Sequence, residues 1–119
     1  MRYKLAVATP DGNRVAEDIR QADYFVVFDI ARGRVTGWEV RDRSDHVPSG
    51  RRTSLPVECF KDCRYLIAGG LGETAESLCM RNGTDLLSTN IETVTEALEA
   101  YFDGMLMGRE AFETPHPRA

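Results

Sequence analysis

Apolar runs separated by turn residues predict the strands of a sheet. Lys4–Thr9 and Tyr65–Ala68 are almost continuously apolar at their centres, which is typical of strands covered on both faces. Tyr24–Ile30 is rich in aromatic and β-branched residues and is predicted as a third strand. Val35–Arg41 alternates in polarity and is predicted as its antiparallel hairpin partner, with one face exposed to solvent. Asp85–Ser88 adds a short fifth strand.

Helices are predicted mainly from the residues at their ends. Ser54, followed by proline in the first turn, begins a short helix that ends near Lys61 or Asp62. A second helix is predicted over 73–81, after a run of glycines. Thr93 and Glu96 form a capping box that begins an amphipathic third helix, which Gly104 ends.

The order of these elements predicts the fold class. The hairpin requires antiparallel neighbours, whereas the later β-α-β-α-β unit requires parallel strands with right-handed crossovers. The chain is therefore expected to be an α/β protein with a mixed five-stranded sheet flanked by helices. Residues 1–108 are assigned to one domain and residues 109–119 to a flexible C-terminal tail, while residues 42–53 form the longest irregular stretch.

Composition excludes several classes of protein. With 119 residues, of which 42% are hydrophobic and 29% charged, the chain suits one globular domain rather than a disordered segment. Its apolar runs are too short for a membrane span, and no export signal precedes the first turn, so we expect a cytoplasmic protein without a membrane partner. The net charge of −4 disfavours nucleic acid as a partner.

Charge is unevenly distributed along the chain. Residues 1–52 carry 10 Lys and Arg against 8 Asp and Glu, whereas residues 53–119 carry 5 against 11. The arginine excess gathers at Arg41, Arg43, Arg51 and Arg52. Such a stretch is either an ordinary solvated loop or a loop that attracts an anion.

A glycine-rich segment is the first candidate for chemistry. Gly69, Gly70 and Gly72 lie between a predicted strand and a predicted helix. Glycines let backbone N–H groups approach a ligand, and a helix N-terminus favours an anion. The alternative is that these glycines only allow the strand and helix to pack closely.

Metal ligands are the second candidate. His46 lies among the arginines of the irregular stretch, where a ring nitrogen can face a metal centre whose other ligands are negative. Cys59 and Cys63 lie four residues apart, and with Cys79 they offer soft ligands, although buried structural thiols are the simpler reading. The sequence contains no nucleophile elbow, zinc-protease helix or phosphate-binding loop, so no catalysis is expected.

Several segments, taken in order, resemble one known family. They are Leu5–Thr9 with Asp11 and Gly12, Val15–Glu17, Ala22–Phe25, Val27–Asp29, Asp62–Gly72, and Thr93–Tyr101 with Gly104. In their order and spacing the chain resembles the dinitrogenase iron–molybdenum cofactor biosynthesis family of NifX-like domains. The resemblance implies a ribonuclease-H-like three-layer fold. It also implies a role in nitrogen fixation: non-catalytic binding of the iron–molybdenum cofactor or a related metal–sulfur cluster, exchanged with cofactor-assembly donor and acceptor proteins.

One departure from the family leaves two functions open. Relatives commonly carry His-Phe-Gly where this chain has Asp18, Ile19 and Arg20, so a soft ligand is replaced by a carboxylate. One hypothesis is a carrier in which the cluster lies against the glycine segment, is countered by Arg20 and Arg43, and is ligated by His46 or Cys63. The other is an interaction or regulatory module that has lost the cluster, and a metal-dependent phosphodiesterase has the least support.

Overall fold

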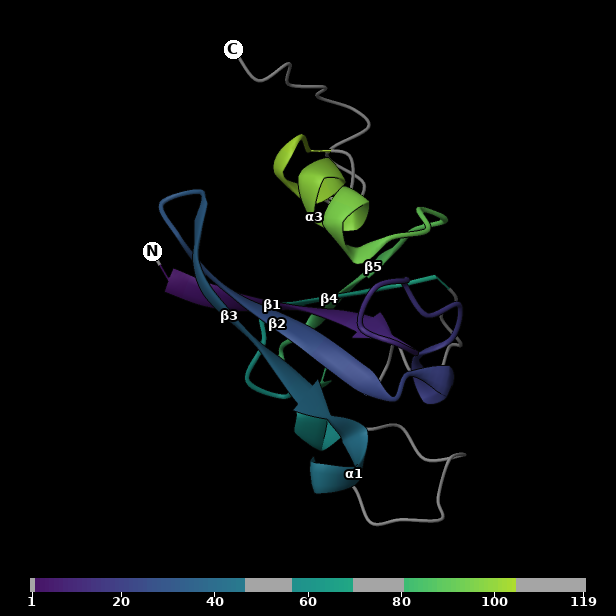
Figure 1. The fold of residues 1–119 in the computed structure, drawn as a ribbon. Coiled ribbons are helices and arrows are strands. Elements are labelled where there is room, and N and C mark those ends of the chain that lie inside the picture. The colour runs from purple at the N-terminus through teal and green to yellow at the C-terminus, as the bar shows by residue number, and fades with distance from the viewer. Residues whose placement is uncertain (1, 47–56, 70–80, 105–119) are drawn as a thin grey trace.

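The computed structural model describes residues 2–46, 57–69 and 81–104 (Figure 1). The elements follow in the order β1 (Arg2–Thr9), the 3-10 turn η1 (Ile19–Gln21), β2 (Tyr24–Ala31), β3 (Arg34–Asp42), α1 (Arg43–His46), the 3-10 turn η2 (Val57–Cys59), β4 (Tyr65–Ala68), β5 (Asp85–Ser88) and α3 (Val94–Phe102). No helix within the described ranges is long and apolar enough to cross a membrane.

The strands form a mixed five-stranded sheet in the order β3-β2-β1-β4-β5. β1 pairs antiparallel with β2, and β2 pairs antiparallel with β3. β4 is parallel to both β1 and β5. The mixed α/β sheet predicted from the sequence is therefore confirmed, with β1 at its centre.

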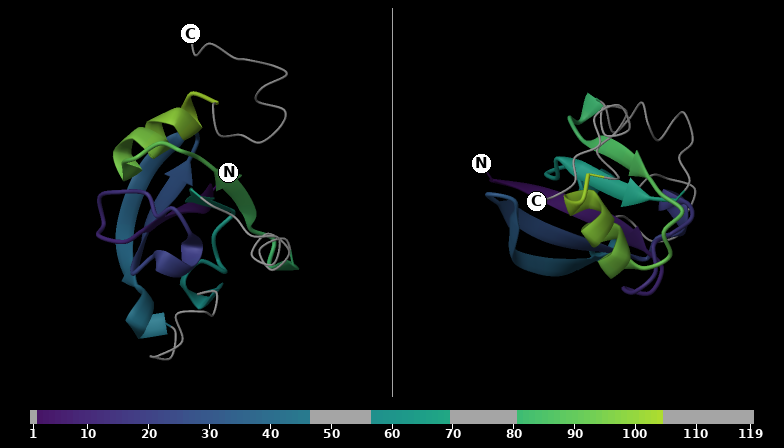
Figure 2. Two further views of the ribbon diagram at one scale, coloured as in Figure 1. Left: turned by 90° about the vertical axis from the view of Figure 1, so that its right-hand side faces the viewer. Right: turned by 90° about the horizontal axis from the view of Figure 1, so that it is seen from above.

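Apolar side chains pack on both faces of this sheet. α3 covers one face, where Val94, Ala97 and Tyr101 pack on strand residues such as Leu5 and Ile67. The other face buries Ile19 of η1 together with phenylalanines and both described cysteines. Figures 1 and 2 show α3 on its own side of the sheet. The described residues place the four-residue helix α1, the 3-10 turns and loops away from α3. The ribonuclease-H-like three-layer arrangement remains a prediction.

The ends of α3 match the sequence. The Thr93 hydroxyl accepts the Glu96 N–H at 3.2 Å and donates to the Glu96 carboxylate at 2.7 Å, so Thr93 is the N-cap and is paired with Glu96, as predicted. Gly104 follows the helix at φ +84°, a conformation that glycine adopts readily. In the predicted 54–62 helix, the described part is the 3-10 turn η2. The predicted 73–81 helix lies almost wholly outside the described residues, as does the domain boundary at 108.

Two predictions for the hairpin region are wrong. The stretch 42–53 was expected to be irregular, but α1 occupies Arg43–His46, and the Asp42 carboxylate accepts the Ser44 N–H at 2.9 Å as a helix cap. β3 was expected to expose one face, but most of its residues are exposed on both. The reason is its position at the edge of the sheet, where α3 does not reach.

Candidate functional site

The chain turns sharply where β1 ends. Thr9 is fully buried, and its hydroxyl accepts the Gly12 N–H at 2.8 Å. The Asp11 carboxylate accepts the N–H groups of Asn13 and Arg14, both at 2.9 Å. These backbone hydrogen bonds, followed by the Arg14 guanidinium, lower the pKa of Asp11 to about 2. The turn thus fixes the direction of the chain after β1.

After the turn, the chain crosses the carboxyl ends of the parallel strands. Ala16 N–H donates to the Ala8 carbonyl at 2.8 Å, and Gly69 N–H donates to the Ala16 carbonyl at 2.8 Å. The same segment also contacts the loop before α3, where Val15 N–H donates to the Glu92 carbonyl at 2.7 Å. These bonds tie the 13–17 segment to β1, to the end of β4 and to the loop before α3.

Gly69 permits this close approach. A Cβ built on Gly69 would lie 2.9 Å from Glu17 Cα and 3.1 Å from the Ala16 carbonyl oxygen. Both are backbone atoms, which cannot move aside as the end of a flexible side chain can. Gly69 is therefore required for packing, which was the alternative reading of this glycine, and it also lines the cleft described next.

A cleft of about 750 Å³ opens beside these segments. Its described lining residues are Pro10, Arg14, Val15, Ala16, Glu17, Gln21, Gly69, Thr89, Asn90, Ile91 and Glu92. It therefore lies beyond the carboxyl ends of β1, β4 and β5. From β1 the chain continues to β2 on one side of that strand, whereas β4 and β5 lie on its other side, so the direction in which strands are added changes at β1. Open α/β sheets bind their ligands at such a switch point.

The cleft lining is part apolar and part polar, and its polar side chains offer oxygen atoms rather than sulfur or imidazole nitrogen as ligands. Among the described lining residues, Arg14 is the one positively charged side chain, whereas Glu17 and Glu92 carry carboxylates. Gln21 and Asn90 add amides to the lining. The described lining contains no cysteine or histidine, and no group of three or more potential metal-binding side chains occurs anywhere in the described ranges.

Asp18 and Arg20, both predicted to face a cluster, bind each other. Arg20 Nη2 lies 2.8 Å from Asp18 Oδ2, and the Asp18 carboxylate also accepts the Arg20 backbone N–H at 2.8 Å. The Arg20 guanidinium lowers the pKa of Asp18, which is thereby kept ionised as the cap of η1. Their neighbours Glu17 and Gln21 line the cleft, but Asp18 and Arg20 do not.

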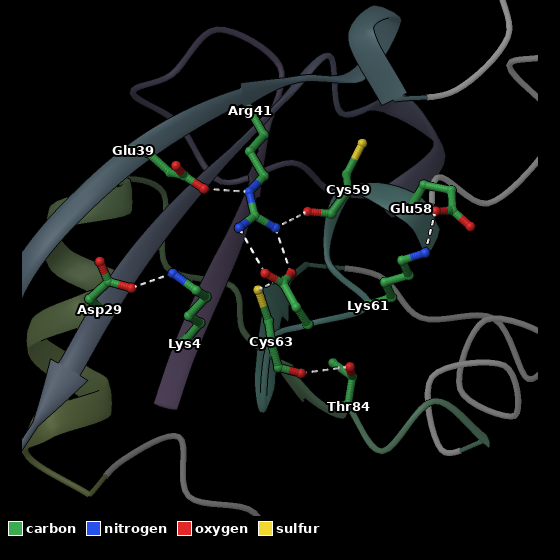
Figure 3. Close-up of polar contacts among 10 residues, drawn as sticks. Lys4, Asp29, Glu39, Arg41, Glu58, Cys59, Lys61, Cys63 and Thr84 are labelled. Atoms are coloured by element: carbon green, nitrogen blue, oxygen red, sulfur yellow. Dashed lines mark hydrogen bonds and ion pairs between the residues drawn. The ribbon is translucent and has the colours of Figure 1, made fainter. Parts of the chain in front are cut away.

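Of the four predicted anion-attracting arginines, Arg51 and Arg52 lie outside the described residues, and the other two contact groups of the protein itself. Arg43 is buried, and its guanidinium donates to the Arg20 carbonyl at 2.8 Å, which holds η1 in place. Arg41 binds both oxygens of Asp62, at 2.6 and 2.9 Å, and Glu39 at 2.6 Å (Figure 3). These two guanidinium groups therefore serve the fold.

Cys63 lies far from the cleft. It precedes β4, whereas Gly69 follows β4, and six residues of extended chain span roughly 20 Å. Burial raises the pKa of the Cys63 thiol to about 12, and burial also raises that of Cys59 to about 11. The Cys63 sulfur lies 3.7 Å from the Asp62 carboxylate. The structure thus keeps both thiols protonated inside the core.

For the remaining predicted site residues, His46, Gly70 and Gly72, the structure describes no side-chain position. His46 is the last residue of α1, and its side chain is not among the described ones. Gly70 and Gly72 fall in residues 70–80, outside the described ranges. Of the eight predicted site residues, Gly69 is thus the one in the described cleft lining.

Sequence analysis missed the polar residues of the cleft. Arg14, Glu17, Asn90 and Glu92 stand in short loops that directly follow β1 or β5. Their position after two parallel strands was the available signal, because the carboxyl ends of parallel strands share one edge of the sheet. Without the strand order, those two loops could not be brought together.

Comparison with solved structures shows the same fold. The apo form of the orange protein from Desulfovibrio gigas superposes with a TM-score of 0.70 at 21% identity, covering 87% of this chain and 90% of that one. A Methanocaldococcus jannaschii protein, provisionally described as a dinitrogenase, gives 0.67 at 13% identity and covers 89% and 93%. A Thermotoga protein, provisionally described as a NifB protein, gives 0.64 at 23% identity and covers 87% and 90%.

Sequence comparison identifies the family. No curated protein sequence matches this chain. The model of the family described as dinitrogenase iron-molybdenum cofactor matches residues 1–104, which include every described strand and helix. The chain belongs to the dinitrogenase iron-molybdenum cofactor family.

Proposed function

We propose that this protein binds and carries an iron–molybdenum or related metal–sulfur cluster during cofactor assembly, without catalysing a reaction. The observation that carries the proposal is the cleft at the switch point of a sheet whose whole length matches the family. Here the cluster is cargo, received from one assembly protein and delivered to another.

The cleft would hold this cargo mainly by shape and hydrogen bonds. Gly69 exposes backbone in the cleft lining, while Gln21 and Asn90 offer amide donors there. Arg14 is the cation of the described lining, and its Nε is held 3.0 Å from the Asp11 carboxylate, which leaves its other guanidinium N–H groups as donors. Weak, exchangeable contacts of this kind suit a carrier, because cargo has to leave again.

The paired arginines favour a second candidate. Arg20 and Arg43 are occupied by protein groups, and the described cleft lining lacks thiol and imidazole ligands. Those observations favour an interaction or regulatory module that kept the fold and lost the cluster. The two functions differ in one measurable property, which is uptake of metal and sulfide by the purified protein.

Anaerobic reconstitution distinguishes the two. The protein is incubated with thiomolybdate, ferrous iron and sulfide, desalted, and analysed for metals, sulfide and visible absorption. A carrier gains stoichiometric metal and colour, and the cleft-filling variant Asn90→Trp does not. Asn82→Trp, an equally exposed position outside the cleft lining, is the matched control and reconstitutes normally.

A second variant tests the missing family ligand. Restoring His-Phe-Gly in full would place phenylalanine at Ile19, which is 1% exposed in the core, and overpacking there costs about 1–3 kcal/mol. The double change Asp18→His with Arg20→Gly leaves Ile19 unchanged. If wild type stays colourless and this variant takes up metal and sulfide, the cluster site of the family is present in this chain and only its histidine ligand has been lost.

A further inference from the structure

Three apolar side chains form an exposed strip along β3. Trp38 is 65% exposed, Val40 is 50% exposed and Val35 is 38% exposed, and they are the exposed large hydrophobic residues of the described ranges. Single exposed apolar residues are ordinary, but a contiguous strip with tryptophan at its centre is typical of an interaction surface. Trp38 is also the only tryptophan of the chain.

The pairing register places this strip on the same sheet face as α3. Trp38 pairs with Phe28 and Val40 pairs with Val26, and both of those β2 residues pack in the core beneath α3. Opposite residues of an antiparallel pair project from the same face. The strip therefore extends the α3-side core beyond the part that α3 covers.

A bulge in β3 keeps the strip continuous. Asp29 pairs with Gly37, but the next β2 residue, Ile30, pairs with Val35, so Thr36 is an extra residue. Without it, Val35 would project from the opposite face to Trp38. The bulge thus aligns all three apolar side chains on one face.

The strip is accessible from the sheet face and poorly suited to strand addition. The bulge interrupts the outer edge of β3, and this edge also carries Arg34, Glu39 and Arg41. Bulges and charges are the devices that prevent pairing at an edge strand. Figure 2 shows the β2–β3 hairpin curving on the α3 side of the sheet, so a ligand of the strip would lie beside α3.

The charge of α3 specifies the ligand further. Residues 94–103 carry three acidic residues, Glu96, Glu99 and Asp103, and no lysine or arginine. A second copy of this face would bring two acidic helices together, which is unfavourable. A ligand with apolar residues beside lysine or arginine would meet both the strip and the helix favourably.

We propose that Val35, Trp38 and Val40 form a docking surface for a cationic amphipathic helix of a partner protein. The helix lies on the sheet beside α3, with its apolar stripe on the strip and its basic residues toward the acidic residues of α3. This surface is formed by β3 and α3 and does not depend on what the cleft binds.

Trp38 fluorescence provides the test. The probe is a synthetic amphipathic helix of leucine and lysine, about 18 residues long so that it is helical in isolation. Titration is expected to shift Trp38 emission to the blue and protect it from acrylamide. A helix of the same leucine pattern with glutamate in place of lysine is expected to bind at least about tenfold more weakly.

Variants separate the two parts of the surface. Val40→Ser removes half-exposed apolar area and is expected to weaken lysine-helix binding about tenfold. Glu99→Gln with Asp103→Asn is expected to weaken binding about threefold and reduce its salt dependence. Glu58→Gln removes a negative charge from an exposed position outside this surface and is expected to leave binding unchanged.

Three results would overturn the proposal. One is equal affinity for the lysine and glutamate helices, and another is binding that Val40→Ser leaves unchanged in a folded variant. The third is a dimer, seen by sedimentation without peptide, that protects Trp38 and dissociates in Val40→Ser. That last result would assign the strip to a second copy instead of a partner.

Discussion

Replacing Gly69 by alanine is predicted to destabilise the protein strongly. The added Cβ would lie 2.9 Å from Glu17 Cα, 3.1 Å from the Ala16 carbonyl oxygen and 3.2 Å from the Glu17 carbonyl oxygen. All three contacts are with backbone atoms, and the Ala16 carbonyl among them accepts a hydrogen bond from Gly69 itself, so the clash is relieved by separating the 13–17 segment from β4. That movement also lengthens the 2.8 Å hydrogen bond from Gly69 N–H to Ala16.

The magnitude follows from these two effects. Overpacking a tight site costs about 1–3 kcal/mol, and weakening one backbone hydrogen bond costs about 1 kcal/mol. Together they lower the free energy of unfolding by about 2–4 kcal/mol. For a chain of this size, about 4 °C per kcal/mol converts this to a fall in Tm of about 8–16 °C.

Thermal unfolding followed by circular dichroism measures this, with Gly37→Ala as the matched control. A Cβ on Gly37 meets only Asp29 Oδ2, at 3.4 Å, which is ordinary contact with a movable side chain. Removing a strand glycine there is expected to leave Tm unchanged or raise it slightly. If Gly69→Ala melts within about 2 °C of wild type, the close approach of Gly69 to the 13–17 segment does not stabilise the fold, and the reasoning is wrong.

Three further predictions concern single side chains. At pH 8, iodoacetamide is expected to leave Cys59 and Cys63 unlabelled until urea unfolds the protein, because burial holds both thiols protonated; rapid labelling of either without urea would contradict this. Arg43→Met leaves carbonyls of the η1 turn without their donor and is expected to cost about 1–3 kcal/mol in urea unfolding, so an unchanged midpoint would count against its structural role. Asp11 has a folded pKa of about 2, below its ordinary value of 3.8, so its contribution is present above pH 4 and lost as pH falls towards 2. The Tm difference between wild type and Asp11→Asn should therefore shrink over that range, and a constant difference would refute it.

The sheet was predictable from the sequence because its signals are local. The apolar runs at Leu5–Ala8 and Tyr65–Ala68 and the capping box at Thr93 each act within a few residues. Each was found where expected. The exposure of β3 was not predictable in this way. Alternating polar and apolar residues indicate a strand with one polar and one apolar face, but they do not show whether a helix extends far enough to cover the apolar face.

The site was harder to predict because its chemistry depends on partners distant in the chain. Arg41 looked like a free cation until the structure placed Asp62 against it, 21 residues away. Arg43 likewise was assigned to an anion but binds the carbonyl of Arg20. Sequence shows which residues carry charge, whereas only the fold shows which charges the protein itself neutralises.

The cleft escaped prediction for a related reason. Its polar walls come from two loops about 75 residues apart, which the strand order β1-β4-β5 brings side by side. Gly69 was identified because a glycine after a strand has few explanations. Arg14 and Glu92 were not, since a charged residue in a loop is ordinary until a cleft is known.

Metal and sulfide uptake by the wild-type protein tests the central claim most directly. After anaerobic incubation with thiomolybdate, ferrous iron and sulfide, the carrier account predicts coloured protein with about one cluster per chain. It also predicts that Asn90→Trp abolishes this uptake and that Asn82→Trp retains it. Colourless, metal-free wild type, with the Asp18→His and Arg20→Gly double variant equally colourless, would contradict the carrier account and leave the interaction module as the function of this fold.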